Sequence, residues 1–297
     1  MTRARSGSSF TGELFNRNRN FAYFFEPLLD LVNSGATAYH RDIKTHPFGE
    51  ADLSRLRAVM QCNFTDYKWL NGREIRLCCE HSEIFHRTKI CESIKMKKSQ
   101  SELNANIEQS CRRQKHVAIK TIRVPDIGSL EGLVSDPELN VKLIHLIRDP
   151  RAVIMSRNAV HFQKDENHCD ELRNNLRYLQ NPPDWLRGRH MLLRYEDLAD
   201  DPLVITEKIY RFIGLDVVPA EVKAWLQINT NRKSDNPYSR SRVSNESAHA
   251  WRQKIAYSIC ADIQRVCRVP LMLAGYRSVS SIDDLRNMNV PMLNKLP

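Results

Sequence analysis

The sequence predicts an α/β fold, a single domain in which helices flank a central, mostly parallel sheet. Three runs indicate buried parallel strands, because each is rich in aliphatic side chains and ends abruptly in charge. They are residues 117–122 (VAIKTI), 141–147 (VKLIHLI) and 191–193 (MLL) with its flanks. Helical patterns separate or follow the runs, and this alternation is typical of α/β proteins. The 297 residues can form one such domain, over 1–297, with a sizeable core.

The remaining elements follow from spacing and composition. Residues 202–212 (PLVITEKIYRF) place apolar side chains near helical spacing, and Gly214 follows as a C-cap. Residues 248–273 predict one or two further helices with a break near Pro270. Residues 39–115 are polar, irregular and cysteine-bearing, which predicts an insertion of helices and loops over the sheet. We expect its basic cluster, Lys95, Lys97 and Lys98, to be a solvated face.

Composition limits the class of protein. Hydrophobic residues make up 41% and charged residues 27%, as in ordinary globular proteins. The net charge of +10 favours anionic partners, although a basic surface alone would also explain it. No run reaches the roughly 18 apolar residues of a membrane span, and no signal peptide is recognisable, so the sequence reads as soluble.

The eight cysteines contain no C-x-x-C pair and suit either a disulfide-permitting compartment or buried thiols. Two N-x-S/T sequons, at Asn63 and Asn245, point weakly to the same compartment.

The first candidate anion site is residues 5–10, R-S-G-S-S-F. Gly7 permits a tight turn, and Ser6, Ser8 and Ser9 place hydroxyls beside free backbone N–H groups. Phe10 then begins the apolar face of a helix whose N-terminus favours anions, and Arg5 adds a cation with bidentate geometry. The Walker A pattern is absent, and a serine turn that only caps a helix is the alternative.

The second candidate site is residues 141–158, VKLIHLIRDPRAVIMSRN. A buried strand ends at Arg148, Asp149 can cap the following helix, and Pro150 suits the first helical position. Ser156 lies two helical turns beyond Asp149 on the same face. Arg148 and Ser156 can therefore converge on one anion at the carboxyl end of a strand, where open α/β sheets bind ligands. An ordinary strand–helix corner is the alternative.

Several motifs in order resemble one family. They are R-S-G-S-S-F at residue 5, F-F-E-P at residue 24, H-L-I-R-D-P-R-A-V at residue 145, R-Y-E-D-L at residue 194, R-V-S and W-R at residues 242 and 251, and G-Y at residue 275. Together they resemble the sulfotransferases that use 3′-phosphoadenosine 5′-phosphosulfate (PAPS), and most closely the Golgi galactose, N-acetylglucosamine and N-acetylgalactosamine 6-O-sulfotransferases. The resemblance covers most of the chain and implies a P-loop-like domain.

The resemblance assigns roles to residues. It implies that Arg5 neutralises the 5′-phosphate and the bridging oxygen, and that Ser8, Ser9 and the loop backbone hold the same phosphate. Arg148 and Ser156 would clamp the 3′-phosphate. The other residues of these two loops are expected to contact the nucleotide: Ser6, Gly7, Phe10, Asp149, Pro150 and Arg151. Arg242 and Ser244 match a further nucleotide-binding segment, with Val243 in place of the family's asparagine.

Glu26 is the candidate general base, since a carboxylate facing the sulfate could take the proton of the acceptor hydroxyl. Pro27 favours extended geometry at Glu26, which predicts a loop. A salt-bridged structural carboxylate is the alternative. His145 lies in the middle of a predicted strand and is expected to be a packed core histidine.

The chain departs from the family at its start. The family's first strand leads directly into the serine-rich loop, whereas only four residues precede Arg5 here, and the family's cytoplasmic tail, membrane anchor and stem are not in the sequence. This predicts a truncated chain whose neighbouring strands lack a partner on one side, and poor folding or inactivity when it is expressed alone.

The resemblance also implies partners and a location. It implies PAPS as co-substrate without a metal, a glycan acceptor of keratan, chondroitin or mucin type, no nucleic acid, and residence in the Golgi lumen or membrane through an anchor missing from this chain. The rivals are a nucleotide kinase-like enzyme and an inactive basic glycan- or nucleic-acid-binding module. Nothing in residues 39–115, the region expected to shape the acceptor cleft, distinguishes among the three sugars.

Overall fold

A computed structural model of the chain describes residues 1–29, 48–65, 67, 73–96, 99–159, 167–231 and 244–296. Its strands are β1 (Phe21–Phe25), β2 (His116–Lys120), β3 (Leu143–Ile147) and β4 (His190–Arg194). Its helices up to β3 are α1 (Ser8–Asn16), α3 (Glu50–Met60), α4 (Arg73–His81), α5 (Glu83–Arg87), α6 (Ile90–Lys95), α7 (Gln100–Arg112), the 3₁₀ turn η2 (Ile127–Leu130) and α8 (Glu131–Val134). Those after β3 are α9 (Pro150–Asn158), α10 (His168–Gln180), the 3₁₀ turn η3 (Asp184–Leu186), α11 (Tyr195–Asp200), α12 (Pro202–Phe212), α13 (Ala220–Asn229), α14 (Ser244–His249), α15 (Trp251–Lys254), α16 (Tyr257–Val266), α17 (Arg268–Leu273) and α18 (Ile282–Arg286).

The strands form two parallel pairs. β1 pairs with β2 in the register Phe21↔His116, and β3 pairs with β4 in the register Leu143↔His190. The parallel strands predicted at β2, β3 and β4 are confirmed, with ends shifted by up to two residues at β2 and β3. β1 was not predicted, because its sequence FAYFF is aromatic rather than aliphatic. All five of its residues are buried, so it shows no alternation of polar and apolar side chains.

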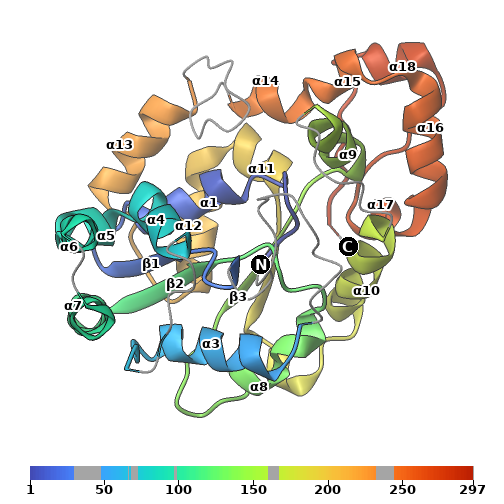
Figure 1. The fold of residues 1–297 in the computed structure, drawn as a ribbon. Coiled ribbons are helices and arrows are strands. Elements are labelled where there is room, and N and C mark those ends of the chain that lie inside the picture. Colours follow the sequence, from blue (N-terminus) through green and yellow to red (C-terminus); the bar gives the residue numbers. More distant parts are fainter. Residues whose placement is uncertain are drawn as a thin grey trace.

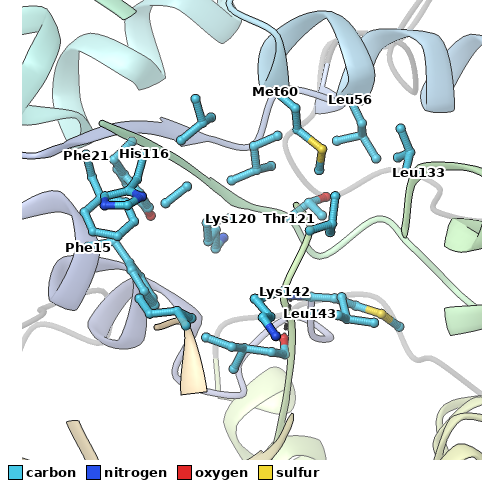
Figure 2. A pocket seen from close by; sticks show the side chains of 18 of the residues that line it. Phe15, Phe21, Leu56, Met60, His116, Lys120, Thr121, Leu133, Lys142 and Leu143 are labelled. Atoms are coloured by element: carbon cyan, nitrogen blue, oxygen red, sulfur yellow. Dashed lines mark hydrogen bonds between the residues drawn. The ribbon is translucent and has the colours of Figure 1, made fainter. Parts of the chain in front are cut away.

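The predicted central sheet is divided between β2 and β3, which do not pair with each other among the described strands. A cavity of about 910 Å³ lies between the two pairs, lined largely by apolar side chains such as Leu56, Met60 and Leu133 (Figure 2). Met1 closes part of the gap: its amine donates to Ile144 O at 2.9 Å, and Leu146 N donates to Met1 O at 3.0 Å.

Helices cover both strand pairs. The helices described within residues 39–115 pack mainly over β1 and β2 (Figure 1). Lys95 is exposed, while Lys97 and Lys98 lie outside the described residues. Helix α12 has the predicted bounds, and Gly214 follows it with a positive φ of 82°. Residues 248–273 were predicted as one or two helices, but they form the end of α14 and all of α15, α16 and α17. The break nearest Pro270 lies at Cys267, because Pro270 occupies the first turn of α17, where its missing N–H costs no helical hydrogen bond.

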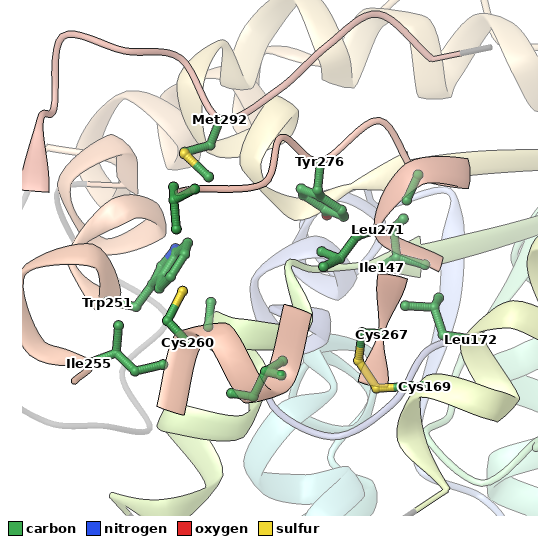
Figure 3. Packing of buried hydrophobic residues seen from close by; sticks show 14 of the residues in the cluster. Ile147, Cys169, Leu172, Trp251, Ile255, Cys260, Cys267, Leu271, Tyr276 and Met292 are labelled. Carbon is green, nitrogen blue, oxygen red and sulfur yellow. A yellow bond between two sulfur atoms is a disulfide. The ribbon is translucent and has the colours of Figure 1, made fainter. Parts of the chain in front are cut away.

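Six of the eight cysteines pair. The disulfides join Cys62 to Cys111, Cys79 to Cys91 and Cys169 to Cys267. Cys78 and Cys260 are buried thiols, so both interpretations of the cysteines hold in part. The Cys169–Cys267 bond lies in a core that packs α9, α10 and the C-terminal helices around Ile147 and Trp251 (Figure 3).

Candidate active site

Residues 5–10 form a tight turn that leads into α1. Gly7 is the N-cap with a φ of 90°, and a Cβ added there would lie 2.2 Å from Cδ2 of Tyr195. Position 7 therefore requires glycine for its backbone conformation and for space. Because the N-cap has no side chain, none of the serines serves as the N-cap of α1, which was the alternative interpretation. The first-turn N–H groups of α1 instead present the partial positive charge that favours an anion.

The other residues of this turn occupy different environments. Arg5 has a positive φ of 72° and is half-buried, as are Ser8 and Ser9, whereas Ser6 is buried. Phe10 packs against Trp225 in a tilted arrangement, with ring centroids 5.3 Å apart. Phe10 thus anchors the turn to the core, and the turn leaves Arg5 and two serines accessible to a ligand.

The second segment folds as predicted at the end of β3. The carboxylate of Asp149 caps α9 by accepting from Arg151 N at 2.9 Å, and Pro150 begins the helix. Arg148 is half-buried, and its Nε is buried with no hydrogen-bond partner among the described residues. Buried donors in proteins usually have a hydrogen-bond partner, so this N–H is available to a bound group.

Arg151, predicted to contact the nucleotide, instead lies inside the protein. Its side chain is 0% exposed and pairs with Asp149 through Nε–Oδ1 and Nη2–Oδ2 at 2.9 and 2.7 Å. It also donates to Gln264 Oε1 at 2.7 Å and Arg277 O at 3.0 Å. Burial lowers the pKa of this guanidinium, but the charge and hydrogen bonds of Asp149 outweigh burial and raise it above its ordinary value. Arg151 therefore braces the turn from behind.

The two predicted segments meet directly. Arg5 Nε donates to Ser156 Oγ at 3.1 Å, and Arg148 Nη1 donates to Arg5 O at 3.2 Å. The Tyr195 ring packs against Gly7 of the first segment, and the Arg148 guanidinium of the second lies 4.8 Å from its centroid. The turn before α1 and the start of α9 thus form one basic site, which we call the paired-arginine site, defined by Arg5, Arg148 and Ser156.

Glu26 follows β1 and is 2% exposed. The extended geometry predicted from Pro27 is wrong: Glu26 has a φ of 52°. Its N–H donates to Lys120 O at 2.8 Å, while its carboxylate contacts Lys120 Nζ at 2.5 Å and Arg123 Nε at 3.6 Å. These contacts at the end of β2 hold the backbone in the left-handed region despite the strain. The geometry matches the salt-bridged alternative, and the catalytic role of Glu26 stays a prediction.

Lys120 was not singled out from the sequence. Burial lowers its pKa, and Arg123 adds to this effect while the neighbouring Glu26 carboxylate opposes it. The same ion pair acts on the buried amine of Met1, whose pKa burial lowers to about 5; there Glu26 raises the pKa and Lys120 lowers it. The Glu26–Lys120 pair therefore lies near the N-terminus that leads into the paired-arginine site.

Three other sequence predictions have mixed outcomes. His145 is a buried core histidine, stacked on His190 with ring centroids 5.9 Å apart. Arg242 lies outside the described residues, and Ser244 begins α14, with nothing further described of its side chain.

Among the described residues no group of three His, Cys, Asp or Glu side chains could hold a metal ion. No helix in the described part of the chain is long and apolar enough to cross a membrane.

The sequence analysis assigned no role in the site to residues 194–197, although they belong to the R-Y-E-D-L motif. Tyr195 contacts both halves of the paired-arginine site, and Glu196 Oε1 accepts from Asp149 N at 3.0 Å. The position of this segment could have indicated its role. It follows β4 as Arg148 follows β3, so both lie at the edge where parallel sheets bind ligands.

The fold and this site define an α/β protein with a basic site, built from two arginines and a serine, at the carboxyl ends of its parallel strands. The model of the sulfotransferase domain family matches residues 1–279. Carbohydrate sulfotransferase 1 of Danio rerio is 32% identical over 97% of this chain and 80% of its own length. Carbohydrate sulfotransferase 3 of Mus musculus is 29% identical over 99% of this chain and 71% of its own length. The sulfotransferase domain of the Synechococcus PCC 7002 olefin synthase aligns at a TM-score of 0.44 and 18% identity, over 90% of this chain and 91% of that chain. The chain belongs to the carbohydrate sulfotransferase family.

Proposed function

We propose that this enzyme transfers the sulfuryl group of PAPS to the 6-hydroxyl of a sugar in a keratan-, chondroitin- or mucin-type glycan. The observation that carries the proposal is the contact between Arg5, Ser156 and Arg148, which joins two anion-binding loops. The names of the relatives, carbohydrate sulfotransferases 1 and 3, support a sugar acceptor. PAPS carries phosphates on two sides of its ribose, and two adjoining basic loops suit such a ligand.

In this proposal each loop holds one end of the nucleotide. Arg5, Ser8, Ser9 and the N–H groups of the first turn of α1 bind the 5′-phosphate and receive the charge that develops as its bond to sulfur breaks. Arg148 and Ser156 bind the 3′-phosphate, and the unpaired Nε of Arg148 is a donor that this phosphate would satisfy. Most of the rate acceleration then comes from positioning and from this charge stabilisation.

The chemical step makes and breaks one bond to sulfur. The sugar O6 forms a bond to sulfur, the bond from sulfur to the 5′-phosphate oxygen breaks, and that phosphate leaves with the electron pair. The hydroxyl proton goes to Glu26. For this the carboxylate must exchange part of its contact with Lys120 for the acceptor hydroxyl, and Lys120 then lies beside the sulfuryl oxygens to balance their charge.

The test is transfer of labelled sulfate from PAPS to desulfated keratan, chondroitin and mucin-type acceptors. Arg5→Ala should lower the rate about 100-fold or more through loss of charge stabilisation. Glu26→Gln should lower it by at least about 100-fold through loss of the base. Glu83→Gln is the matched control, since this carboxylate pairs with Arg17 away from the site and should leave the rate near wild type.

Two outcomes would overturn the proposal. Binding of ATP with magnesium in preference to adenosine 3′,5′-bisphosphate would favour a kinase. Salt-dependent glycan binding that survives both substitutions, with no sulfate transfer, would favour a binding module.

We also propose that the enzyme works in the Golgi lumen. Three disulfides are consistent with an oxidising compartment, and the family resemblance implies the Golgi in particular. Alkylation of the protein from cells should label two thiols of eight without reductant, at Cys78 and Cys260, and only after denaturation. Labelling of all eight, or localisation in the cytosol by microscopy, would contradict the proposal.

A further inference from the structure

Glu196 is a buried carboxylate that lies beside the paired-arginine site and is connected to it through Asp149. It lies in the first turn of α11 and is 2% exposed. Its Oε1 accepts from Asp149 N at 3.0 Å, and its Oε2 accepts from the Tyr276 hydroxyl at 2.9 Å. One side chain therefore connects the turn between β3 and α9 to the C-terminal segment, where Tyr276 is also buried.

The bond to Asp149 fixes the peptide that follows Arg148. Asp149 is the N-cap of α9, so its own N–H has no helical acceptor and would otherwise be left without one. By accepting from it, Glu196 sets the orientation of the peptide plane between residues 148 and 149, and with it the direction in which the Arg148 side chain leaves the backbone. The adjacent Tyr195 ring lies under the guanidinium at 4.8 Å. Two consecutive residues thus hold the backbone and the head group of one arginine.

The surroundings of Glu196 disfavour its charged form. Burial and the charge of Asp149 raise the pKa of Glu196, while Arg148 and the backbone N–H groups oppose them. Burial and the charges of Glu196 and Asp149 raise the pKa of Tyr276 well above its ordinary value, so the phenol stays a donor. Two buried carboxylates this close to each other destabilise a fold unless both are held by donors. Such groups concentrate at functional sites, where strain and charge serve binding.

We propose that Glu196, supported by Tyr276, is a positioning residue that presents Arg148 to the 3′-phosphate of the nucleotide. This inference rests on the proposed function, and it assigns to the segment after β4 a role in telling a 3′,5′-bisphosphate from a 5′-monophosphate. Glu196 does not touch the nucleotide in this scheme and acts only through Arg148.

The experiment compares the binding of adenosine 3′,5′-bisphosphate and adenosine 5′-phosphate by calorimetry. Glu196→Gln keeps the shape of the side chain but removes its charge. It should weaken bisphosphate binding about tenfold, the usual scale for one charge-assisted hydrogen bond, and leave monophosphate binding unchanged. In the transfer assay KM for PAPS should rise by the same factor, with kcat within about threefold of wild type. Tyr276→Phe should weaken bisphosphate binding and raise KM for PAPS by about threefold, because Glu196 stays in place but loses one hydrogen-bond donor.

A double-mutant cycle separates positioning from general damage. Arg148→Ala should itself abolish most of the preference for bisphosphate, and Glu196→Gln added to it should change nothing further. Asp197→Asn is the matched control: this carboxylate lies in the same helical turn but pairs with Arg194, so the preference should stay at the wild-type value.

The inference is overturned if folded Glu196→Gln keeps the wild-type preference, or if it weakens both nucleotides equally. It is also overturned if its effect persists in the Arg148→Ala background. If Glu196→Gln does not fold, Tyr276→Phe takes its place. The inference is then overturned if Tyr276→Phe keeps the wild-type preference, weakens both nucleotides equally, or has an effect that persists in the Arg148→Ala background. A wild-type chain without any preference for the bisphosphate would instead refute the proposed function, before any variant is compared.

Discussion

The two sides of β3 are built in opposite ways. At its carboxyl end, the turn into α9 is packed with paired polar groups, where Asp149, Arg151, Glu196 and Tyr276 are all buried and hydrogen-bonded to one another or to neighbouring segments. Along the edge that faces β2, a cavity of about 910 Å³ separates strands that do not pair. Binding geometry and sheet continuity are therefore specified by separate parts of the molecule, and substitutions on the two sides should have separable effects.

The largest effect is expected from Asp149→Asn on the packed side. It leaves the fully buried guanidinium of Arg151 with a neutral partner, and breaking a buried ion pair typically costs about 3–5 kcal/mol. The free energy of unfolding, measured by denaturant titration, should fall by that amount. Asp184→Asn breaks an ion pair whose side chains are 69% and 95% exposed, and should change it by less than about 0.5 kcal/mol. Equal losses in the free energy of unfolding for the two variants would show that the buried Asp149–Arg151 pair contributes no more to stability than an exposed ion pair.

Acid should weaken the β3–β4 pair through its two histidines. Burial lowers the pKa of His190 to about 4, and burial together with the charge of His190 holds that of His145 well below its ordinary value. Between pH 6.5 and about 4 the unfolded chain binds protons that the folded chain excludes, so stability is present above pH 6.5 and is lost as the pH falls.

The measurement is the stability of wild type minus that of His190→Gln as a function of pH. This difference should fall by up to about 3 kcal/mol between pH 7 and pH 4, because His190 is absent from the variant. A difference that stays constant with pH would mean that His190 titrates normally in the folded protein.

The smallest expected effect comes from making the same substitution, alanine to isoleucine, beside the cavity and in the packed core. Ala118 lies on β2 and lines the cavity, so Ala118→Ile should fill space and raise the free energy of unfolding by about 1 kcal/mol. Ala152 lies on α9 and is 0% exposed in a packed core, so Ala152→Ile should lower it by about 1–3 kcal/mol. Opposite signs in thermal or denaturant unfolding would support the comparison, and destabilisation by both would contradict it.

Features set by local chemistry were predictable from the sequence, and those set by packing between distant segments were not. The turn at Gly7 and the start of α9 at Pro150 follow from local sequence rules. That the two segments lie together, as in the contact of Arg5 with Ser156, was implied by the family resemblance and not by a local rule. The contact of Glu196 with Tyr276 joins residues 80 positions apart, and no periodicity encodes it. The positive φ of Glu26 arises from its pairing with Lys120 on another strand, which outweighs the local preference imposed by Pro27.

The pattern of disulfides divides the chain covalently. Cys79–Cys91 is nested within the span of Cys62–Cys111, and Cys169–Cys267 closes a separate loop in the second half. All eight cysteines lie in the described residues, so no disulfide links residues 62–111 to the part of the chain that carries the paired-arginine site. The disulfides of residues 62–111 are therefore closed within that segment, and a chimaera that exchanges it for the corresponding segment of another sulfotransferase would leave the Cys169–Cys267 bond unchanged.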